Sequence, residues 1–204
     1  AGMIGFTTSN DPGVTVAAHG SSEPALGNLP YAWGVPAGRE PDIVLDMGTG
    51  TVADGKVSLA ALDDSPAGAG WGLDADGEPA IRAADIAALL PFGGAKGFGI
   101  NLVSDVLGGI LAGNEASSVL AKQSDRKDLW TSHFFLALDV AAFTDEAEFR
   151  ARVDRQIQAV RAARRAPGVE RILIPGERAG ESHRRQLKLG IELPAMIRIR
   201  LEEL

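Results

Sequence analysis

The chain has 204 residues, of which 45% are hydrophobic and 23% are charged, a composition typical of soluble globular proteins and compatible with one large domain or two interleaved lobes. Its 27 acidic residues against 20 Lys and Arg give a formal charge of −7, which argues against nucleic acid or an anionic membrane as the main partner. Cysteine is absent, so disulfides, thiolate catalysis and Cys-ligated zinc are excluded. No apolar run reaches the length of a membrane span, and the absence of cysteine fits a reducing compartment, so we expect a cytoplasmic protein.

The first part of the chain reads as short strands and turns. Three short apolar or β-branched runs are bounded by Pro or Gly, as is typical of strands: Val14–Ala17, Tyr31–Val35 and Ile43–Asp46. The segment Gly68–Gly77 is a loop rich in glycine and aspartate. The apolar segment Ala83–Leu90 is expected to form a short helix that ends at Pro91.

The stretch Gly97–Leu111 is apolar nearly all round, which predicts a helix buried on every side. A strand is expected at Phe134–Val140, because apolar residues alternate there. Thr144 then caps a helix with an apolar stripe at helical spacing. We interpret its opposite, arginine-rich face as solvated, and expect Pro167 and Gly168 to end the helix.

Two further strands are expected near the carboxyl end. Arg171–Ile174 enters a turn at Pro175 and Gly176, and Met196–Leu201 alternates apolar and basic residues as a half-exposed strand does. Strands, a helix and more strands without a regular βαβ repeat indicate an α/β fold of the α+β type.

The segment Pro91–Gly99 carries the strongest local signal for a ligand. Its glycines leave backbone N–H groups free to approach an anion at the start of a helix, and Lys96 adds a positive charge. The spacing matches neither a P-loop nor a Rossmann fingerprint. From these residues alone, a structural glycine turn explains the segment equally well.

Two other loops are weaker candidates. Asp46–Thr51 follows a strand with small residues, so a ligand could approach its backbone, although a tight turn is the simpler explanation. Ile174–Arg178 delivers a Glu and an Arg that could bind a ribose or a phosphate, or form a surface ion pair. No cluster of acids and histidines points to a metal.

Taken together, these segments resemble the malate/L-lactate dehydrogenase-type family of NAD(P)-dependent oxidoreductases, which includes ureidoglycolate dehydrogenase, diketogulonate reductase and the cyclic imine reductases. The resemblance rests on the order of motifs over nearly the whole chain: Gly2–Gly5 with Ser9-Asn10, Gly27–Pro30, Val44–Met47, Leu90–Gly99, His133–Phe135 and Pro175–Glu177. It implies a non-Rossmann fold with a largely antiparallel cofactor-binding sheet and packed helices. It also implies a dimer.

The resemblance further implies which residues meet NAD or NADP. Asp46, Met47, Gly48 and Thr49 match the segment that lines the nicotinamide dinucleotide, and Lys96 with Gly97 matches the contact at the helix start. The late loop that returns to the cofactor matches Gly176, Glu177 and Arg178, and Ser9 stands near the nicotinamide. The cofactor-binding domain would span 1–132, and 133–204 would complete the fold.

The chain also departs from the family pattern. The family's proton-donating histidine in a Ser-His-Gly motif, and a nearby arginine, are not among these residues, so no catalytic residue is assigned. Asn28 and Leu29 replace the usual Thr-Asn pair that faces the substrate, and His19 replaces a glycine. We take these three positions as substrate-proximal, although a benign turn histidine is the simpler interpretation of His19.

Two functions follow from these observations. In the first, the chain is a subunit or fragment of an oxidoreductase that transfers hydride between NAD(P)(H) and a small 2-oxo or 2-hydroxy acid or cyclic imine. The acid–base segment would then be cleaved off or carried by a companion amino-terminal polypeptide. In the second, the scaffold is repurposed as a non-redox enzyme or a structural partner, as the altered Asn28 and Leu29 suggest.

Overall fold

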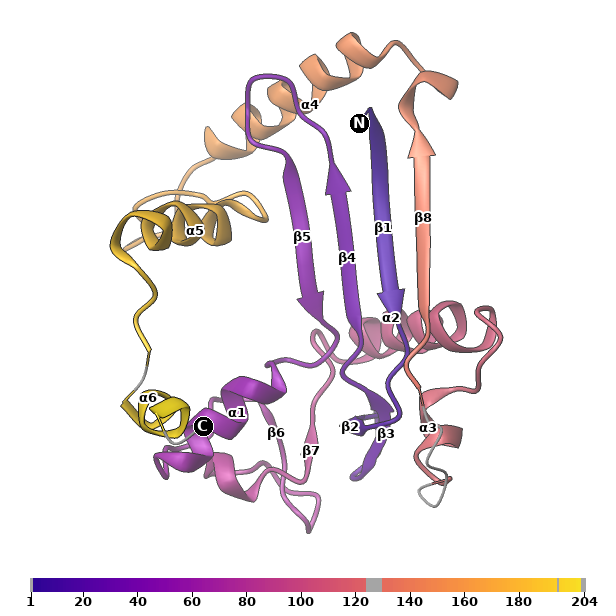
Figure 1. The fold of residues 1–204 in the computed structure, drawn as a ribbon, viewed down its shortest axis with the longest axis vertical. Helices are drawn as coiled ribbons and strands as arrows, with labels where there is room; N and C mark the ends of the chain where they lie inside the picture. Colours follow the sequence, from indigo (N-terminus) through magenta and orange to yellow (C-terminus); the bar gives the residue numbers. More distant parts are fainter. Residues whose placement is uncertain (1, 124–129, 194, 203–204) are drawn as a thin grey trace.

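The computed structural model describes residues 2–123, 130–193 and 195–202. Its main sheet has the strand order β5-β4-β1-β8, and every neighbouring pair is antiparallel (Figure 1). The strands are β1 (Met3–Ser9), β4 (Pro30–Val35), β5 (Ile43–Gly48) and β8 (His133–Asp139). The predicted strands at 31–35 and 43–46 are confirmed, and the strand at 134–140 is confirmed except for Val140, which begins a 3₁₀ turn. The antiparallel sheet with packed helices confirms the expected fold class.

A smaller sheet lies at the end of the main sheet where β1 and β5 finish (Figure 1). Its order is β3-β2-β7-β6, with β2 parallel to β7, and its strands are β2 (Val14–Ala17), β3 (Pro24–Gly27), β6 (Gly72–Leu73) and β7 (Ala88–Leu89). Val16, Val52 and Leu89 form its buried core, against which Val57 of helix α1 (Asp54–Leu62) packs.

The helix predicted at 83–90 is therefore wrong. Only Ala83–Asp85 form a short 3₁₀ turn, after which Ala88 and Leu89 are β7. Leu89 pairs with Val16 of β2 and is buried in the core of the smaller sheet. Strand pairing with residues distant in sequence thus determines the conformation of an apolar run too short to show a helical period.

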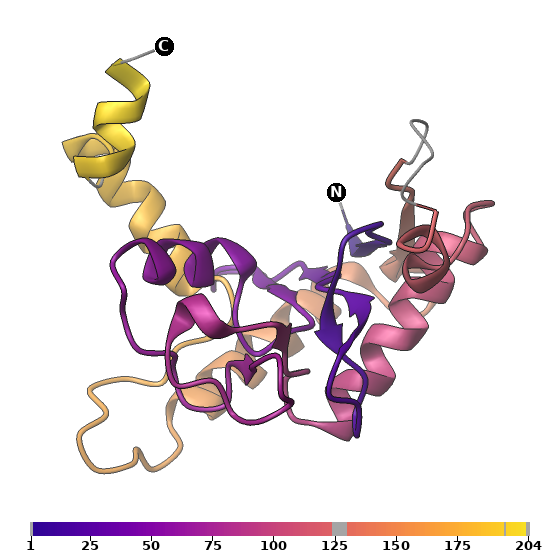
Figure 2. The same cartoon turned by 90° about the horizontal axis from the view of Figure 1, so that it is seen from below.

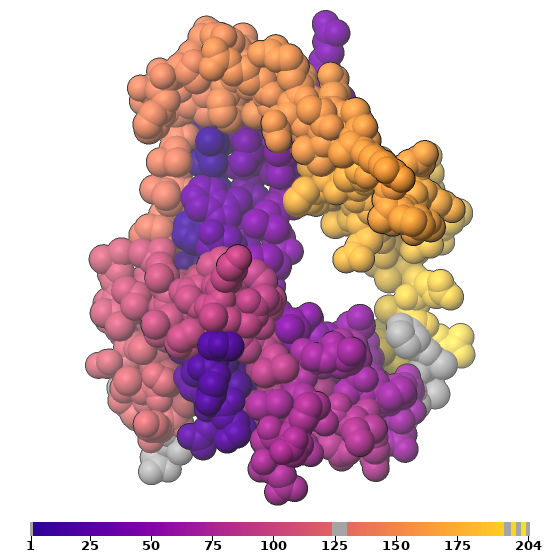
Figure 3. Space-filling model, turned by 180° about the vertical axis from the view of Figure 1, so that it is seen from behind, coloured from indigo at the N-terminus to yellow at the C-terminus, as the bar shows by residue number. Residues whose placement is uncertain are grey.

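Helices cover one face of the main sheet and leave the other open. Helix α2 (Ala95–Asp105) and helix α4 (Glu146–Arg161) lie across the sheet when it is seen from behind, and no helix of the described residues covers the opposite face (Figures 1 and 3). The pleat turns Phe6, Trp33 and Leu136 toward α2, and Gly5, Gly34 and Ala137 toward the open face. We call these the helix face and the open face.

Residues 95–110 do form a continuous helix, but its expected burial on every side is wrong. Helix α2 continues as a π-helical turn, η2 (Val106–Ile110), and is followed by the short helix α3 (Ser117–Leu120). The buried side of α2 carries Gly97, Asn101, Ser104 and Asp105. Several large apolar side chains of α2, of η2 and of the residue that follows are exposed: Leu102, Val103, Val106, Ile110 and Leu111. The apolar composition of this helix therefore reflects an uncovered surface.

The second half of the chain confirms one predicted helix and corrects its ends. After β8 and a 3₁₀ turn (Val140–Ala142), α4 begins behind Asp145, whose Oδ1 accepts a hydrogen bond from the Glu148 N–H at 2.8 Å. Asp145, and not Thr144, is thus the cap. The helix ends at Arg161, before Pro167, and Ile157 of its apolar stripe is buried.

Both strands predicted near the carboxyl end are wrong. Residues 171–174 belong to no strand, and Met196–Leu201 lies within helix α6 (Ala195–Glu202), which follows helix α5 (Glu177–Leu189). Ile174 is buried against Ala37 and Ile157, so its apolar character serves packing and not strand pairing. Figure 2 shows α5 and α6 projecting from the rest of the molecule. Within the described ranges, no helix is long and apolar enough to cross a membrane.

Candidate functional site

The end of β5 places the first group of predicted site residues. Asp46 lies opposite Ala32 of β4 and is exposed on the open face, whereas Met47 lies opposite Tyr31 on the helix face and is half-buried. Gly48 ends the strand and Thr49 is fully buried. The Thr49 N–H donates to the Leu29 carbonyl at 3.0 Å, and its Oγ1 accepts from the Leu29 N–H at 2.9 Å. The loop is therefore anchored where β4 begins.

Asn28 holds the same loop with its side chain. Its Oδ1 accepts a hydrogen bond from the Gly50 N–H at 2.8 Å, and its Nδ2 donates to the Val52 carbonyl at 3.0 Å. A Cβ atom at Gly48 would lie only 2.6 Å from this Oδ1, which explains the glycine there. Leu29 is fully buried. The structure thus gives both residues a role in shaping the loop, and their proximity to a substrate stays a prediction.

Backbone hydrogen bonds bring the Asp46–Thr51 loop against the Pro91–Gly97 turn. The Phe92 N–H donates to the Thr49 carbonyl at 3.1 Å, and the Thr51 N–H donates to the Leu90 carbonyl at 2.8 Å. Gly93 and Gly94 adopt left-handed φ values of 60° and 64°, which favour glycine and turn the chain into α2. The two strongest motifs of the sequence are therefore neighbours in space.

Lys96 is exposed in the first turn of α2 and lines a cavity of about 700 Å³ between this helix and the helix face. Four aromatic rings line the same cavity: Phe6, Tyr31, Trp33 and Phe134. Phe6 and Trp33 pack with their ring centroids 4.6 Å apart. A cation beside an aromatic cavity at a helix start is well placed to meet a ligand that is both flat and anionic.

A groove of about 520 Å³ lies on the open face and contains Asp46. Gly5 and Gly34 face each other across β1 and β4, and a Cβ atom at either position would meet nothing within 4 Å. Ala32 and Ala137 continue this flat floor, and Val44 and Phe135 flank it. Asp46 and Lys96 thus line different faces of the sheet, so the predicted site residues do not converge on one cavity.

The late loop reaches the edge of β5 near this groove. The Pro175 carbonyl accepts a hydrogen bond from the Val44 N–H at 3.0 Å. Gly176 has a left-handed φ of 95°, and a Cβ atom there would lie 2.9 Å from the Val44 Cβ. Arg178 is exposed on the first turn of α5. The structure therefore brings Gly176 beside the strand that carries Asp46.

Glu177 is occupied within the protein. One carboxylate oxygen pairs with Arg161 of α4, and the other accepts a hydrogen bond from the Ile174 N–H at 2.8 Å. The backbone hydrogen bond from Ile174, followed by Arg161, lowers the pKa of Glu177 below its ordinary value. The ion pair with Arg161 was missed because the arginines of α4 were interpreted as a solvated face, which is wrong for Arg150 and Arg161.

Ser9 and His19 are the remaining predicted site residues, and His133 and His183 are the other two histidines. Ser9 is buried where β1 ends, and a Cβ atom at Gly108 would approach its backbone to 2.5 Å. His19 is exposed in the turn after β2, with its ring 3.9 Å from the position of a Cβ at Gly94. His133 and His183 are exposed and lie on β8 and α5. Among the described residues, no three His, Asp or Glu side chains are grouped to hold a metal.

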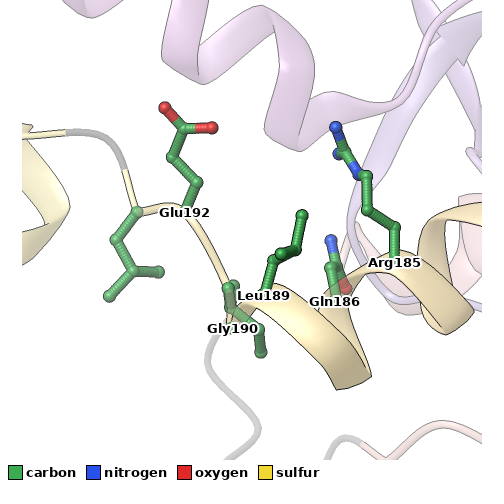
Figure 4. Close-up of a pocket in the computed structure, with 7 residues that line it drawn as sticks. Arg185, Gln186, Leu189, Gly190 and Glu192 are labelled. Atoms are coloured by element: carbon green, nitrogen blue, oxygen red, sulfur yellow. The ribbon is translucent and has the colours of Figure 1, made fainter.

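One more hollow, of about 740 Å³, lies at the end of α5 and contains none of the predicted site residues. Figure 4 shows Arg185, Leu189 and Glu192 extending to one side of α5 and of the coil that follows it. Leu189 is 80% exposed, so this hollow is an open surface beside a projecting helix. The predicted site residues therefore lie in three segments, the end of β5, the start of α2 and the Pro175–Gly176 turn, and they line both faces of the sheet.

The sequence is similar to known dehydrogenases and reductases. The chain is 32% identical to a malate dehydrogenase of Pyrococcus horikoshii over 213 residues. It is also 32% identical to a Δ1-pyrroline-2-carboxylate/Δ1-piperideine-2-carboxylate reductase of Pseudomonas syringae pv. tomato over 209 residues. Each match covers 100% of this chain and 58% of the relative, so the chain spans less than two thirds of the length of these relatives.

Solved structures of malate dehydrogenases also resemble this chain. A malate dehydrogenase of Entamoeba histolytica superposes with a TM-score of 0.90 at 24% identity over 99% of this chain and 60% of that one, which shows the shared fold. The Pyrococcus horikoshii malate dehydrogenase superposes with a TM-score of 0.82 at 31% identity, over 99% of this chain and 57% of that one. The sequence pattern of the malate/L-lactate dehydrogenase family matches residues 1–202. The chain belongs to the malate/L-lactate dehydrogenase family.

Proposed function

We propose that this chain is the dinucleotide-binding part of an NAD(P)-dependent oxidoreductase acting on a small 2-oxo or 2-hydroxy acid or a cyclic imine. The observation that carries the proposal is the junction of the Asp46–Thr51 loop with the Pro91–Gly97 turn, made by the hydrogen bond from Phe92 to Thr49. The names of the relatives support the reaction class, because they are dehydrogenases of malate and sulfolactate and reductases of cyclic imine carboxylates. One of them is named as an NADP(+) enzyme.

The residues present fit a dinucleotide in two respects. The glycine floor formed by Gly5 and Gly34 leaves room for a flat group beside Asp46, and Gly176 brings a second backbone close to the same strand. Lys96 supplies a positive charge at the start of an 11-residue helix, where phosphate binds favourably. In this proposal the bound cofactor supplies the hydride, and this chain orients it.

We also propose that this chain forms a homodimer, and that an amino-terminal segment or a companion polypeptide supplies the acid–base residues, since a second copy of these residues carries no assigned catalytic residue either. The exposed apolar side of α2 and η2 supports a partner, since solvated helices rarely expose so many large apolar side chains together. Sedimentation of the purified protein over a dilution series tests the proposed homodimer. A single monomeric species at all concentrations would contradict it.

Fluorescence titration with NADPH and NADH tests the proposed function directly. The protein, purified together with any polypeptide that accompanies it, is expected to enhance and shift the nucleotide fluorescence saturably. Lys96→Gln is expected to weaken binding, whereas Lys188→Gln, on the exposed surface of α5, leaves it unchanged. A protein that binds neither nucleotide would contradict the oxidoreductase proposal and favour a repurposed scaffold.

A further inference from the structure

Arg161 links three separate parts of the chain at the end of α4. One guanidinium nitrogen pairs with Glu40, in the loop between β4 and β5, and another pairs with Glu177, the first residue of α5. The three side chains are 32%, 19% and 14% exposed, so solvent screens these pairs less than it screens surface pairs. We call Glu40, Arg161 and Glu177 the clamp.

The Glu40 end of the clamp is fixed to the same helix. Gln158 Nε2 donates to Glu40 Oε1 at 3.1 Å. Asp154, one helical turn before Gln158, accepts three backbone N–H groups from Gly38, Arg39 and Glu40 at 2.8–3.1 Å. The hydrogen bonds of Asp154 and Gln158 therefore hold α4 against the β4–β5 loop, and Arg161 contacts Glu177 from this fixed helix.

The Glu177 end of the clamp closes the Pro175–Gly176 turn. The second oxygen of Glu177 accepts from the Ile174 N–H, and the Glu177 N–H donates to the Ile174 carbonyl at 3.1 Å. Ile174 itself is buried against Ala37 and Ile157. The turn then meets β5 through the hydrogen bond from Val44 to Pro175, two residues before Asp46.

We infer that Arg161 is a positioning residue for dinucleotide binding. The clamp fixes the Pro175–Gly176 turn against Val44, and Glu177 acts through this turn and not as a direct ligand of the cofactor. Both carboxylate oxygens of Glu177 already have partners within the protein, whereas the adjacent Gly176 brings its backbone close to β5, where a ligand can approach it. This inference rests on the proposed function and assigns a role to a residue that sequence patterns did not single out.

A double-mutant cycle on the NADPH dissociation constant tests the inference with Arg161→Met and Glu177→Gln. Each single variant is expected to raise the dissociation constant about tenfold. The double variant is expected to have a dissociation constant no higher than that of the weaker-binding single variant, because both substitutions act on the same turn. Arg161→Lys is expected to bind with intermediate affinity, since one amine cannot hold two carboxylates as a guanidinium fork does. Arg152→Met is the control, because Arg152 of the same helix pairs with Glu148 on the exposed surface.

If Glu177 bound the cofactor directly, Arg161→Met would leave affinity unchanged or raise it, and only Glu177→Gln would weaken it. That result would overturn the inference while the wild-type protein still binds NADPH. Hydrogen exchange at the Val44 amide gives a readout without the nucleotide, and Arg161→Met is expected to accelerate it. If Arg161→Met changed neither the exchange rate of the Val44 amide nor the affinity for NADPH, the inference would also be overturned. If the wild-type protein bound no nucleotide, both this inference and the proposed function would be overturned.

Discussion

Asn28 accepts a hydrogen bond from the backbone N–H of Gly50 at 2.8 Å and so fixes the loop that follows β5. Asn28→Ala removes this acceptor and the donor to the Val52 carbonyl, leaving two half-buried backbone groups without these partners. We expect a loss of about 2 kcal/mol in the free energy of unfolding, measured by urea denaturation. Asp54→Ala removes only an exposed contact with Asn28 and should cost less than about 1 kcal/mol. Equal losses in the two variants would contradict this account.

Gly97 packs directly on the carbonyl of Phe92, where α2 begins. A Cβ atom at this position would overlap that carbonyl, so Gly97→Ala should destabilise the protein by about 1–3 kcal/mol. Gly99→Ala is the matched control two residues later, because a Cβ there meets nothing within 4 Å and Ala favours a helix by up to about 1 kcal/mol. The melting temperatures of both variants test this prediction. A Gly97→Ala variant as stable as the wild type would show that Gly97 does not pack on the Phe92 carbonyl.

Ser117 is fully buried and donates through its Oγ to Asp105 at 2.6 Å, while the Asp11 N–H donates to the same Oγ at 3.1 Å. Ser117→Ala leaves the buried Asp105 carboxyl and the Asp11 N–H without this hydroxyl, so we expect a loss of about 2 kcal/mol in urea denaturation. Ser58→Ala, which removes an exposed hydroxyl bonded to the Asp54 carbonyl, should change stability by less than about 0.5 kcal/mol. A loss no larger than that of Ser58→Ala would disprove the buried network.

Asp154 makes the stability of the β4–β5 loop depend on pH. Its pKa lies below the ordinary value, chiefly because the Arg39 N–H and then those of Gly38 and Glu40 donate to the carboxylate. A lowered folded-state pKa stabilises the protein above the ordinary Asp pKa, and this contribution is lost as the pH falls below about 4. Asp154→Asn should therefore lower the urea midpoint at pH 7 and differ progressively less from wild type toward pH 3. A difference that stays constant with pH would contradict this explanation.

Three of the four strands of the main sheet were predictable from local pattern, whereas β1 was not predicted. Residues 31–35 and 43–46 are apolar or β-branched runs between Pro and Gly, and local pattern suffices for such elements. The segments 83–90 and 171–174 were not predictable, since Leu89 and Ile174 owe their conformation to partners distant in sequence. For α2, apolar composition indicated a helix correctly but could not tell an inner side from an uncovered outer one.

The candidate site was predictable to a similar degree. The motifs at 46–49 and 96–97 were recognisable in order along the chain, and the structure adds that Thr49 and Phe92 join them. The role of Arg161 was hidden because an arginine on a helix surface looks the same in sequence whether it is solvated or paired with two carboxylates. Only the packing of α4 against the β4–β5 loop distinguishes the two.

The central claim is that the end of β5, the start of α2 and the Pro175–Gly176 turn together bind a nicotinamide dinucleotide. Hydrogen exchange with and without saturating NADPH tests it most directly, since it reports each segment separately. The account predicts slower exchange at 44–51, 91–99 and 174–178, with no change in the hollow lined by residues 185–193. Unchanged exchange in all three segments, or protection confined to 185–193, would contradict it.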